Sequence, residues 1–381
     1  MAAVRCGLSP TSSSFKSGKG PVPGAPLHDI HASLAVPGPG IRLLTFDDGG
    51  IRGLSELLLL RKILLRVQQG SGLPSLPTPY EYFDIIAGSG TGGFIALILG
   101  RLRLTIEEAI ECYAHLVTHV FTQIKSDGSF KATSLEKVMR ELCHRFGESK
   151  EMSILDDISA PCKAFVCTRE EDASGHVTHR RLRTYLHPGE PAFQCTVVEA
   201  VRATMGQSKF FKPLSTGKGN TSITYLDAGD DHYNPVFDIL EETQSLYPSG
   251  HMAYCLSLGA GKANTVGENG PRWSLSQPRL PSATLATLRH LAERCDTIAS
   301  AFEAQHGAEF DDKYFRLTPA HPSYDGKIPW EQVDPLEVFV GPYVKSVYDQ
   351  IESVAIAMME ERDLIAASSR KRFERQLRDW R

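Results

Sequence analysis

Two glycine-rich turns restrict the fold of this chain more than any other feature of its sequence. The first turn, at 47–53, lies between a strand-like run at 41–46 and a helical segment. The second turn, at 88–93, lies between a strand-like run at 82–87 and another helical segment. A short glycine turn from a strand into a helix is typical of α/β proteins. The repeated pattern therefore predicts strands and helices that alternate along the chain.

The rest of the chain continues this alternation. Further strands are predicted at 163–168, 181–185, 222–226 and 253–258, and further helices at 105–121, 132–146, 195–204, 283–305 and 336–379. Alternating strands and helices favour an α/β fold with a mainly parallel central sheet flanked by helices. In such folds the chemistry is found at the carboxyl ends of the strands.

Composition excludes several functional classes. The 381 residues have a net charge of -4, so no general attraction to nucleic acid or to an anionic membrane is expected. No apolar run reaches the roughly 18–20 residues that span a bilayer, so any membrane contact is expected to be peripheral. The eight cysteines form no CxxC pair. They predict free thiols in a reducing compartment, without a metal site.

The chain divides by composition into three parts. Residues 1–38 are rich in Ser, Pro and Gly and are predicted to form a disordered tail. This tail also has the serine content of a mitochondrial presequence, but it lacks an apolar helical face. The α/β pattern occupies 39–265, and a helical C-terminal region follows at 266–381. A cytoplasmic location is expected, with a mitochondrial one as the alternative.

The first glycine turn, Asp47-Asp48-Gly49-Gly50-Ile51-Arg52-Gly53, could form an anion site. Successive glycines allow backbone N–H groups to converge at the start of a helix. Such a site holds a phosphate or the oxyanion of an acyl-transfer intermediate. Taken alone, a diglycine favours the simpler interpretation of a tight strand-to-helix turn.

The second glycine turn has the sequence G-S-G-T-G-G and resembles a nucleophile elbow. That elbow requires the pattern G-x-S-x-G with the serine at its strained centre. Here the central position is Gly90, and the nearest serine is Ser89. A plain turn that lets the strand and the helix pack closely is the structural alternative.

The same turn also matches the dinucleotide pattern G-x-G-x-x-G through Gly88, Gly90 and Gly93. That interpretation needs a second strand that ends in an acid about 20 residues later. Glu107 and Glu108 stand in this region, but they lie inside a helical pattern. A Walker loop is excluded because the turn contains no lysine.

A third cluster, Tyr225-Leu226-Asp227-Ala228-Gly229, places an acid at the end of a predicted strand. A carboxylate there could orient or deprotonate a nucleophile opposite it. By itself, an acid at a strand end is more often a turn or cap residue.

Taken in order, the three clusters resemble the patatin-like phospholipase family. The segment 83–102 is similar to a fungal-type patatin elbow with its helix. Segments 203–213 and 234–236 resemble the stretches on either side of the family's catalytic aspartate, and 257–262 resembles a later strand. The resemblance covers roughly 41–265. It implies a three-layer fold with a mainly parallel sheet, here with a C-terminal helical extension.

The family uses a Ser–Asp dyad without histidine, and glycine-turn amides stabilise the oxyanion. Carried over by motif, Asp227 matches the dyad aspartate. Gly49 and Gly50 match the oxyanion glycines, and Arg52 belongs to the same motif. Gly90 occupies the position of the nucleophilic serine, so no acyl-enzyme can form on its side chain.

Two further differences from the family's motifs also indicate impaired catalysis. Asp48 replaces the first glycine of the family's triple, and a carboxylate beside the anion site opposes an oxyanion. Residues 205–208 are Met-Gly-Gln-Ser where the family has Ser-Ala-Ala-Pro. Ser89 is the obvious substitute nucleophile, but it stands one residue early on a sharp turn. Its side chain should therefore point elsewhere, and errors near 1 Å already cost about a hundredfold in rate.

These observations predict a patatin-like protein of lipid metabolism that is related to phospholipases but catalytically impaired. It would act by binding a lipid, a fatty-acyl ester or a protein partner, with no cofactor, no metal and no nucleic acid. The alternative is an active lipid acyl hydrolase that uses Ser89 or a water activated by Asp227. A more distant alternative is a nucleotide-binding protein.

Overall fold

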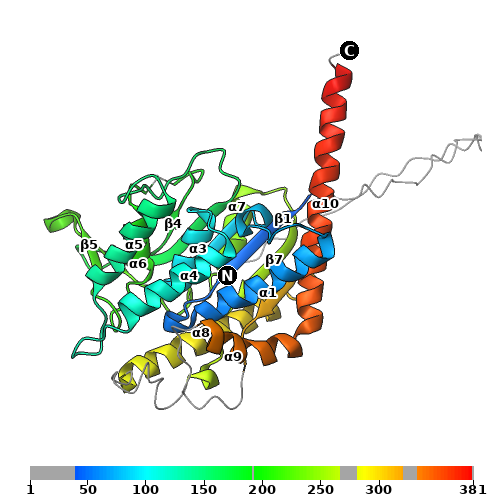
Figure 1. Ribbon diagram of the computed structural model, residues 1–381. Coiled ribbons are helices and arrows are strands. Elements are labelled where there is room, and N and C mark those ends of the chain that lie inside the picture. The colour runs from blue at the N-terminus through cyan, green and yellow to red at the C-terminus, as the bar shows by residue number, and fades with distance from the viewer. Residues whose placement is uncertain (1–38, 191–192, 267–280, 321–332, 380–381) are drawn as a thin grey trace, which may run out of the picture. The chain divides into compact units, whose positions relative to one another are not determined.

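The computed structural model describes residues 39–190, 193–266, 281–320 and 333–379. The predicted tail at 1–38 lies outside the described residues. Helices surround a twisted sheet that crosses the middle of the molecule (Figure 1). The predicted α/β class is therefore confirmed.

The sheet has eight strands in the order β5-β6-β3-β2-β1-β7-β8, and β4 also pairs with β3. Neighbouring strands from β3 through β2, β1 and β7 to β8 are parallel, whereas β4 and β6 are antiparallel to β3, and β5 is antiparallel to β6. The sheet is thus mixed, with a parallel centre. The strands are β1 Ile41–Phe46, β2 Ile85–Ser89, β3 Lys163–Asp172, β4 Val177–Arg183, β5 Leu214–Thr216, β6 Ile223–Leu226, β7 Met252–Leu258 and β8 Tyr314–Leu317.

The direction of the crossovers explains why helices cover both faces of the sheet. The steps from β1 to β2 and from β2 to β3 move one way along the sheet, and the parallel step from β7 to β8 moves the other way. Because parallel crossovers are right-handed, α8 lies on the face opposite α1 and α3. The helices are α1 Leu54–Ser71, α2 Pro79–Tyr82, α3 Gly90–Gly100, α4 Ile106–Leu116, α5 Ala132–Phe146, α6 Val197–Thr204, α7 Val236–Leu246, α8 Ser282–His306, α9 Val333–Ser346 and α10 Tyr348–Asp379.

Helix α3 is the centre of the core. Every residue of α3 is buried, and its apolar side chains extend all round the helix. It packs on β2 and β3 and on α6, so the second glycine turn is anchored from three sides. On the outside of the same layer, α1 packs along α10, drawn in red in Figure 1.

Several predicted elements have different bounds. The strand predicted at 82–87 begins only at Ile85, because Pro79 starts the short helix α2. The strand predicted at 181–185 occupies 177–183 and is antiparallel to β3. The strand predicted at 222–226 is β6, which is only half-buried because it lies in the antiparallel outer part of the sheet. The helix predicted at 336–379 is two helices, α9 and α10.

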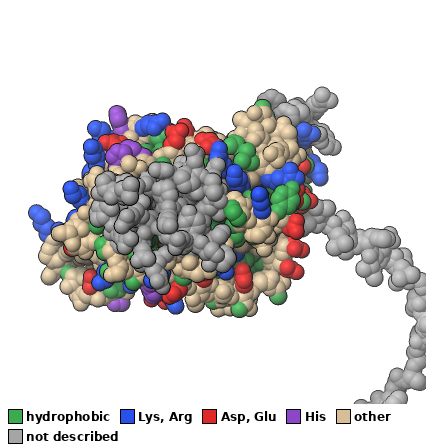
Figure 2. Space-filling view, turned by 60° about the horizontal axis from the view of Figure 1, so that its bottom comes forward, with side chains coloured by type: hydrophobic (Ala, Val, Ile, Leu, Met, Phe, Trp, Pro, Cys, Tyr) green, Lys and Arg blue, Asp and Glu red, His purple; other side chains and the backbone are tan. Residues whose placement is uncertain are grey.

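Within the described ranges, every helix is too short or too polar to cross a bilayer. On the face shown in Figure 2, side chains of Lys and Arg alternate with those of Asp and Glu. Described hydrophobic side chains appear there in small scattered groups. This mixture fits the small net charge of the chain.

Candidate active site

The two glycine turns lie side by side at the carboxyl end of the central strands. β1 and β2 are parallel neighbours, with Phe46 in register with Gly88, so their turns leave the sheet at the same edge. Gly92 of the second turn is so close to the first that an added Cβ would lie 2.3 Å from the carbonyl oxygen of Asp47. Only glycine allows this approach.

Asp48 and Gly90 meet where the two turns touch. A Cβ on Gly90 would lie 2.0 Å from the carboxyl carbon of Asp48, which is closer than any contact that two side chains can make. Gly90 also has a φ of +53°, a left-handed conformation that other residues adopt only under strain. The carboxyl group of Asp48 thus fills the space of the missing side chain.

The carboxyl group also occupies the anion site. Its Oδ1 accepts hydrogen bonds from the backbone N–H of Gly50 at 3.2 Å and from that of Thr91 at 3.4 Å. In a nucleophile elbow, the N–H of the residue after the nucleophile forms half of the oxyanion hole, and here that residue is Thr91. One amide from each turn therefore binds Asp48.

The electrostatics of Asp48 follow from this burial. The pKa of Asp48 is raised from 3.8 to about 7, mainly because burial removes the carboxylate from water. The two amide hydrogen bonds lower this pKa, and the charges of Asp227 and Asp47 contribute to raising it. Asp47 forms an ion pair with Arg316, whose Nη1 lies 2.9 Å from Asp47 Oδ1. Asp48 has no comparable cationic partner among the described residues.

Asp227 follows β6 and is held by three donors. Arg169 Nη2 donates to its Oδ1 at 2.6 Å. The Tyr233 hydroxyl and the Gln207 amide donate to its Oδ2 at 2.8 and 2.7 Å. Asp227 is buried, so these bonds fix the orientation of its carboxylate.

Tyr233 connects the two carboxylates. Its hydroxyl donates to Asp227, and its carbonyl oxygen accepts the N–H of Asp48 at 2.8 Å. The third cluster of the sequence is thereby joined to the first. The structure therefore brings Asp48, Gly90 and Asp227 into one site.

Ser89 points away from this site. It is fully buried at the end of β2, and its hydroxyl donates to the carbonyl oxygen of His232. The neighbouring elbow amide, Gly90 N, donates to Thr204 Oγ1 at 2.9 Å. Ser89 therefore has a structural partner, and the elbow is held by a threonine of α6.

The remaining motif residues have other contacts. Gly49 N donates to Thr91 Oγ1 at 3.3 Å, so this amide ties one turn to the other. The Arg52 guanidinium is buried and donates to the carbonyl oxygen of Gly261 at 2.9 Å. Arg52 thereby holds the segment after β7.

Comparisons with known proteins show which proteins this chain resembles. No protein-family model matches the chain. It is 26% identical over 306 residues to calcium-independent phospholipase A2-gamma of Mus musculus, an alignment that covers 74% of this chain and 35% of that protein. It is 37% identical over 103 residues to phospholipase A I of Arabidopsis thaliana, covering 27% of this chain and 7% of that protein. It is 26% identical over 210 residues to probable inactive patatin-like protein 9 of Arabidopsis thaliana, covering 51% and 52%.

The chain is thus similar to patatin-like phospholipases. The family and the fold expected from the motifs are confirmed. The chain spans 35% of the length of the mouse relative and 41% of the corresponding rabbit protein.

Several residues of this patatin-like site were not identified from the sequence. Gln207 lies in the segment where the chain departs from the family, and that departure was the available signal. Thr204 stands in a segment that resembles the family, but nothing there indicated its bond to the elbow. Arg169 and Tyr233 carry no sequence signal, because their roles depend on strand pairing and on a loop conformation.

One group of side chains has the composition of a metal site. The ligand atoms of Cys167, His179 and Asp238 all lie within 4.8 Å of one another. However, Arg181 Nε donates to Asp238 Oδ1 at 3.0 Å, and His232 Nδ1 lies 2.9 Å from Asp238 Oδ2. Both carboxylate oxygens are therefore satisfied, and the Arg181 charge opposes a dication, so we assign no metal to this group.

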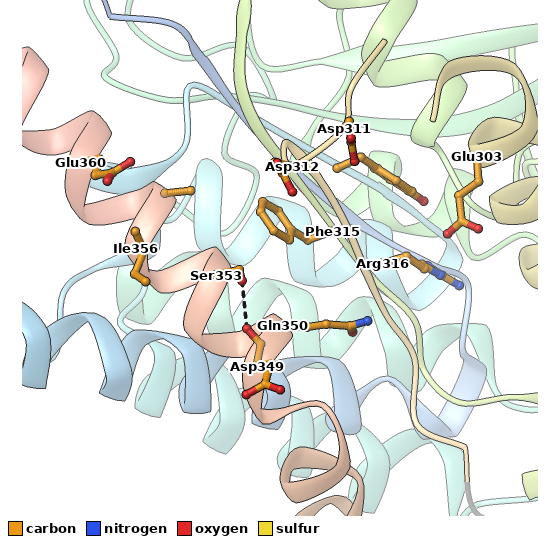
Figure 3. Close-up of a pocket in the computed structure, with 12 residues that line it drawn as sticks. Glu303, Asp311, Asp312, Phe315, Arg316, Asp349, Gln350, Ser353, Ile356 and Glu360 are labelled. Carbon is orange, nitrogen blue, oxygen red and sulfur yellow. Dashed lines mark hydrogen bonds between the residues drawn. The ribbon is translucent and has the colours of Figure 1, made fainter. Parts of the chain in front are cut away.

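A cavity of about 580 Å³ lies between β8 and α10 (Figure 3). Its lining is acidic, and its one guanidinium, from Arg316, is paired with Asp47. This lining differs from the apolar pocket expected for an acyl chain. The acids are Glu303, Asp311, Asp312, Asp349 and Glu360.

Proposed function

We propose that this patatin-like protein binds a lipid or a fatty-acyl ester and has lost the serine chemistry of its family. The observation that carries the proposal is the position of the Asp48 carboxyl group. It fills the side-chain space at Gly90 and accepts hydrogen bonds from Gly50 N and Thr91 N. An acyl-enzyme thus lacks its nucleophile, and the oxyanion lacks free donors.

The lipid ligand is supported by the relatives and by the preserved frame of the site. Two of the relatives are named phospholipases, and a third is named as a probable inactive patatin-like protein. Helix α3, which follows the elbow, is fully buried, and both glycine turns keep their close contact. The frame that supports a family pocket is therefore intact although its reactive group is altered. The cytoplasmic location expected from the sequence stays a prediction.

A fluorophosphonate probe tests the loss of serine chemistry. We expect no labelling of the purified protein by intact-mass spectrometry, and no burst with an activated ester. The double variant Asp48→Gly with Gly90→Ser is the positive control, because it restores the family's residues at both positions. Stoichiometric labelling of the unaltered protein at Ser89 would show that it is an active hydrolase.

Thermal unfolding tests lipid binding separately. A ligand that binds only the folded state raises the melting temperature by mass action. We expect fatty acids or lysophospholipids to raise it, and NAD and ATP to leave it unchanged. Stabilisation by NAD without a response to any lipid would instead support the nucleotide-binding alternative.

A further inference from the structure

The two oxygens of the Asp48 carboxyl group have different surroundings. Oδ1 accepts both amides of the former oxyanion site, at 3.2 and 3.4 Å. Oδ2 and Oδ1 lie 2.2 and 2.3 Å from the point where Gly90 would carry a Cβ, but Oδ2 accepts no hydrogen bond from the described residues. Both oxygens therefore lie beside the nucleophile's position, and only Oδ1 is held by the amides of the anion site.

We propose that Asp48 is itself a nucleophile, whose Oδ2 attacks a saturated electrophilic carbon such as that of an epoxide on a lipid chain. Carboxylates serve as covalent nucleophiles in several enzyme classes. The proposal goes beyond lipid binding and uses the proposed lipid ligand only to choose the substrate's apolar part.

The hydrogen bonds favour a saturated carbon over an ester carbonyl. Attack on an ester would place negative charge on the substrate's carbonyl oxygen, but the amides that would stabilise it already bind Oδ1. Attack on an epoxide places the charge on the leaving oxygen instead. The amides then serve the second step, in which the charge develops on Oδ1 itself.

In the first step, Oδ2 forms a bond to an epoxide carbon and the ring C–O bond breaks. The alkoxide takes a proton from water, which leaves a hydroxide ion in solution. The product is an ester between Asp48 and a hydroxyalkyl chain.

In the second step, a water molecule attacks the carboxyl carbon of Asp48 and its proton passes to Asp227. The tetrahedral intermediate carries its charge on Oδ1, where the amides of Gly50 and Thr91 point. Apo hydrogen bonds of this length commonly shorten in the reacting complex. Collapse breaks the bond between the carboxyl carbon and Oδ2, and the departing oxygen takes the proton from Asp227. The acid left on Asp48 ionises and neutralises the hydroxide, so a diol is released.

The neighbouring carboxylates do not compete for the first step. Asp47 has both oxygens on Arg316. Asp227 accepts three hydrogen bonds, which leaves about one of its roughly four acceptor positions for a water molecule. Asp48 is only 5% exposed and its pKa is raised to about 7, so at neutral pH a dry, partly ionised carboxylate is available.

Covalent labelling with two epoxides tests the proposal. The folded protein is incubated with styrene oxide or with the epoxide of oleic acid, in water enriched in oxygen-18. After turnover, peptide mass spectrometry should find oxygen-18 in the Asp48 carboxylate, because water attacks that carbon. Asp227→Asn should release the ester about 100-fold more slowly, so the adduct should accumulate on Asp48.

Two variants make the result specific. Asp48→Asn should abolish adduct and diol, whereas Asp231→Asn, which alters an exposed acid with 83% side-chain exposure, should behave as the unaltered protein. If Asp48→Asn does not fold, the oxygen-18 label and the adduct in Asp227→Asn still test whether Asp48 is the nucleophile. A folded protein that forms no adduct with either epoxide, or forms it elsewhere than Asp48, would overturn the proposal.

The outcome is separable from that of lipid binding. An adduct with styrene oxide in a protein that no lipid stabilises would support the carboxylate nucleophile and contradict the lipid ligand. Stabilisation by fatty acids without an adduct at Asp48 would support the lipid ligand and contradict the carboxylate nucleophile.

Discussion

The carboxyl carbon of Asp48 lies 2.0 Å from the point where Gly90 would carry a Cβ. The side chain of one residue thus occupies the space that the other residue leaves empty, although the two stand in different turns. A serine at 90 and an aspartate at 48 exclude each other. The two positions therefore have to be changed together, and this coupling can be measured.

Gly90→Ser alone should be destabilising. Overpacking of a dense core costs about 1–3 kcal/mol, and the left-handed backbone of Gly90 adds strain. Asp48→Gly removes the clash, so the double variant should be more stable than the sum of the single effects predicts. Urea unfolding of the unaltered protein, the two single variants and the double variant measures this coupling.

Activity provides a second measurement on the same variants. Only the double variant should hydrolyse a short-chain p-nitrophenyl ester, and Asp227→Asn should remove that activity. A stable Gly90→Ser protein, or a folded double variant that stays at background, would contradict the assignment of positions 48, 90 and 227 to one site.

Ser89→Ala should affect stability and leave probe labelling unchanged. The Ser89 hydroxyl is buried and donates to the carbonyl oxygen of His232, so its removal leaves this carbonyl oxygen without its donor. The expected cost is about 1 kcal/mol in the free energy of unfolding. Fluorophosphonate labelling should stay at background in both proteins. A label on the unaltered protein that Ser89→Ala removes would assign the nucleophile to Ser89.

Arg316→Met should cost much more than the loss of an exposed ion pair. The side chains of Arg316 and Asp47 are only 8% and 3% exposed, so the change leaves an unpaired carboxylate beside β1, with an expected loss of about 3–5 kcal/mol. Arg294→Met is the matched control, because its partner Asp231 is exposed and such pairs contribute about 0–1 kcal/mol. Urea unfolding measures the loss of stability in both variants. Equal losses would show that the buried ion pair stabilises the fold no more than the exposed pair does.

The sequence predicted the frame of this protein well because its signals are local. Each glycine turn stands between a strand and a helix, and parallel strands bring their carboxyl ends to one edge. The runs 41–46 and 253–258 were therefore predicted close to their observed bounds. β5 and β8 were missed because each has only three or four residues and depends on its neighbour for pairing.

The sequence predicted which residues form the candidate site, but not how they contact one another. Motif order brought Asp227 and the two glycine turns together. The sequence also indicated that a carboxylate at Asp48 opposes an oxyanion. It did not indicate that this carboxylate fills the space at Gly90, because that depends on the backbone path of two turns. The three side chains that donate to Asp227 come from three different segments, and nothing in the sequence indicated these hydrogen bonds either.

The dependence of stability on pH isolates the titration of Asp48. Its pKa is about 7 in the folded protein, against an ordinary value of 3.8. Between these values the folded state holds a proton that the unfolded state has lost, so stability falls as the pH rises from about 4 to about 7. Below this window both states are protonated, and above it both are ionised, so the contribution is constant on either side. Asp48→Asn cannot titrate, and its stability relative to the unaltered protein should therefore increase across the window, by an amount on the order of a few kcal/mol.

Asp47 and Glu56 also have raised pKa values, but they are present in both proteins and largely cancel in the comparison. Urea unfolding at several pH values measures the difference, with Asp231→Asn as an exposed control whose curve should run parallel to that of the unaltered protein. Parallel curves for Asp48→Asn as well would mean that Asp48 is ionised throughout, and that the two amides and not burial dominate its pKa.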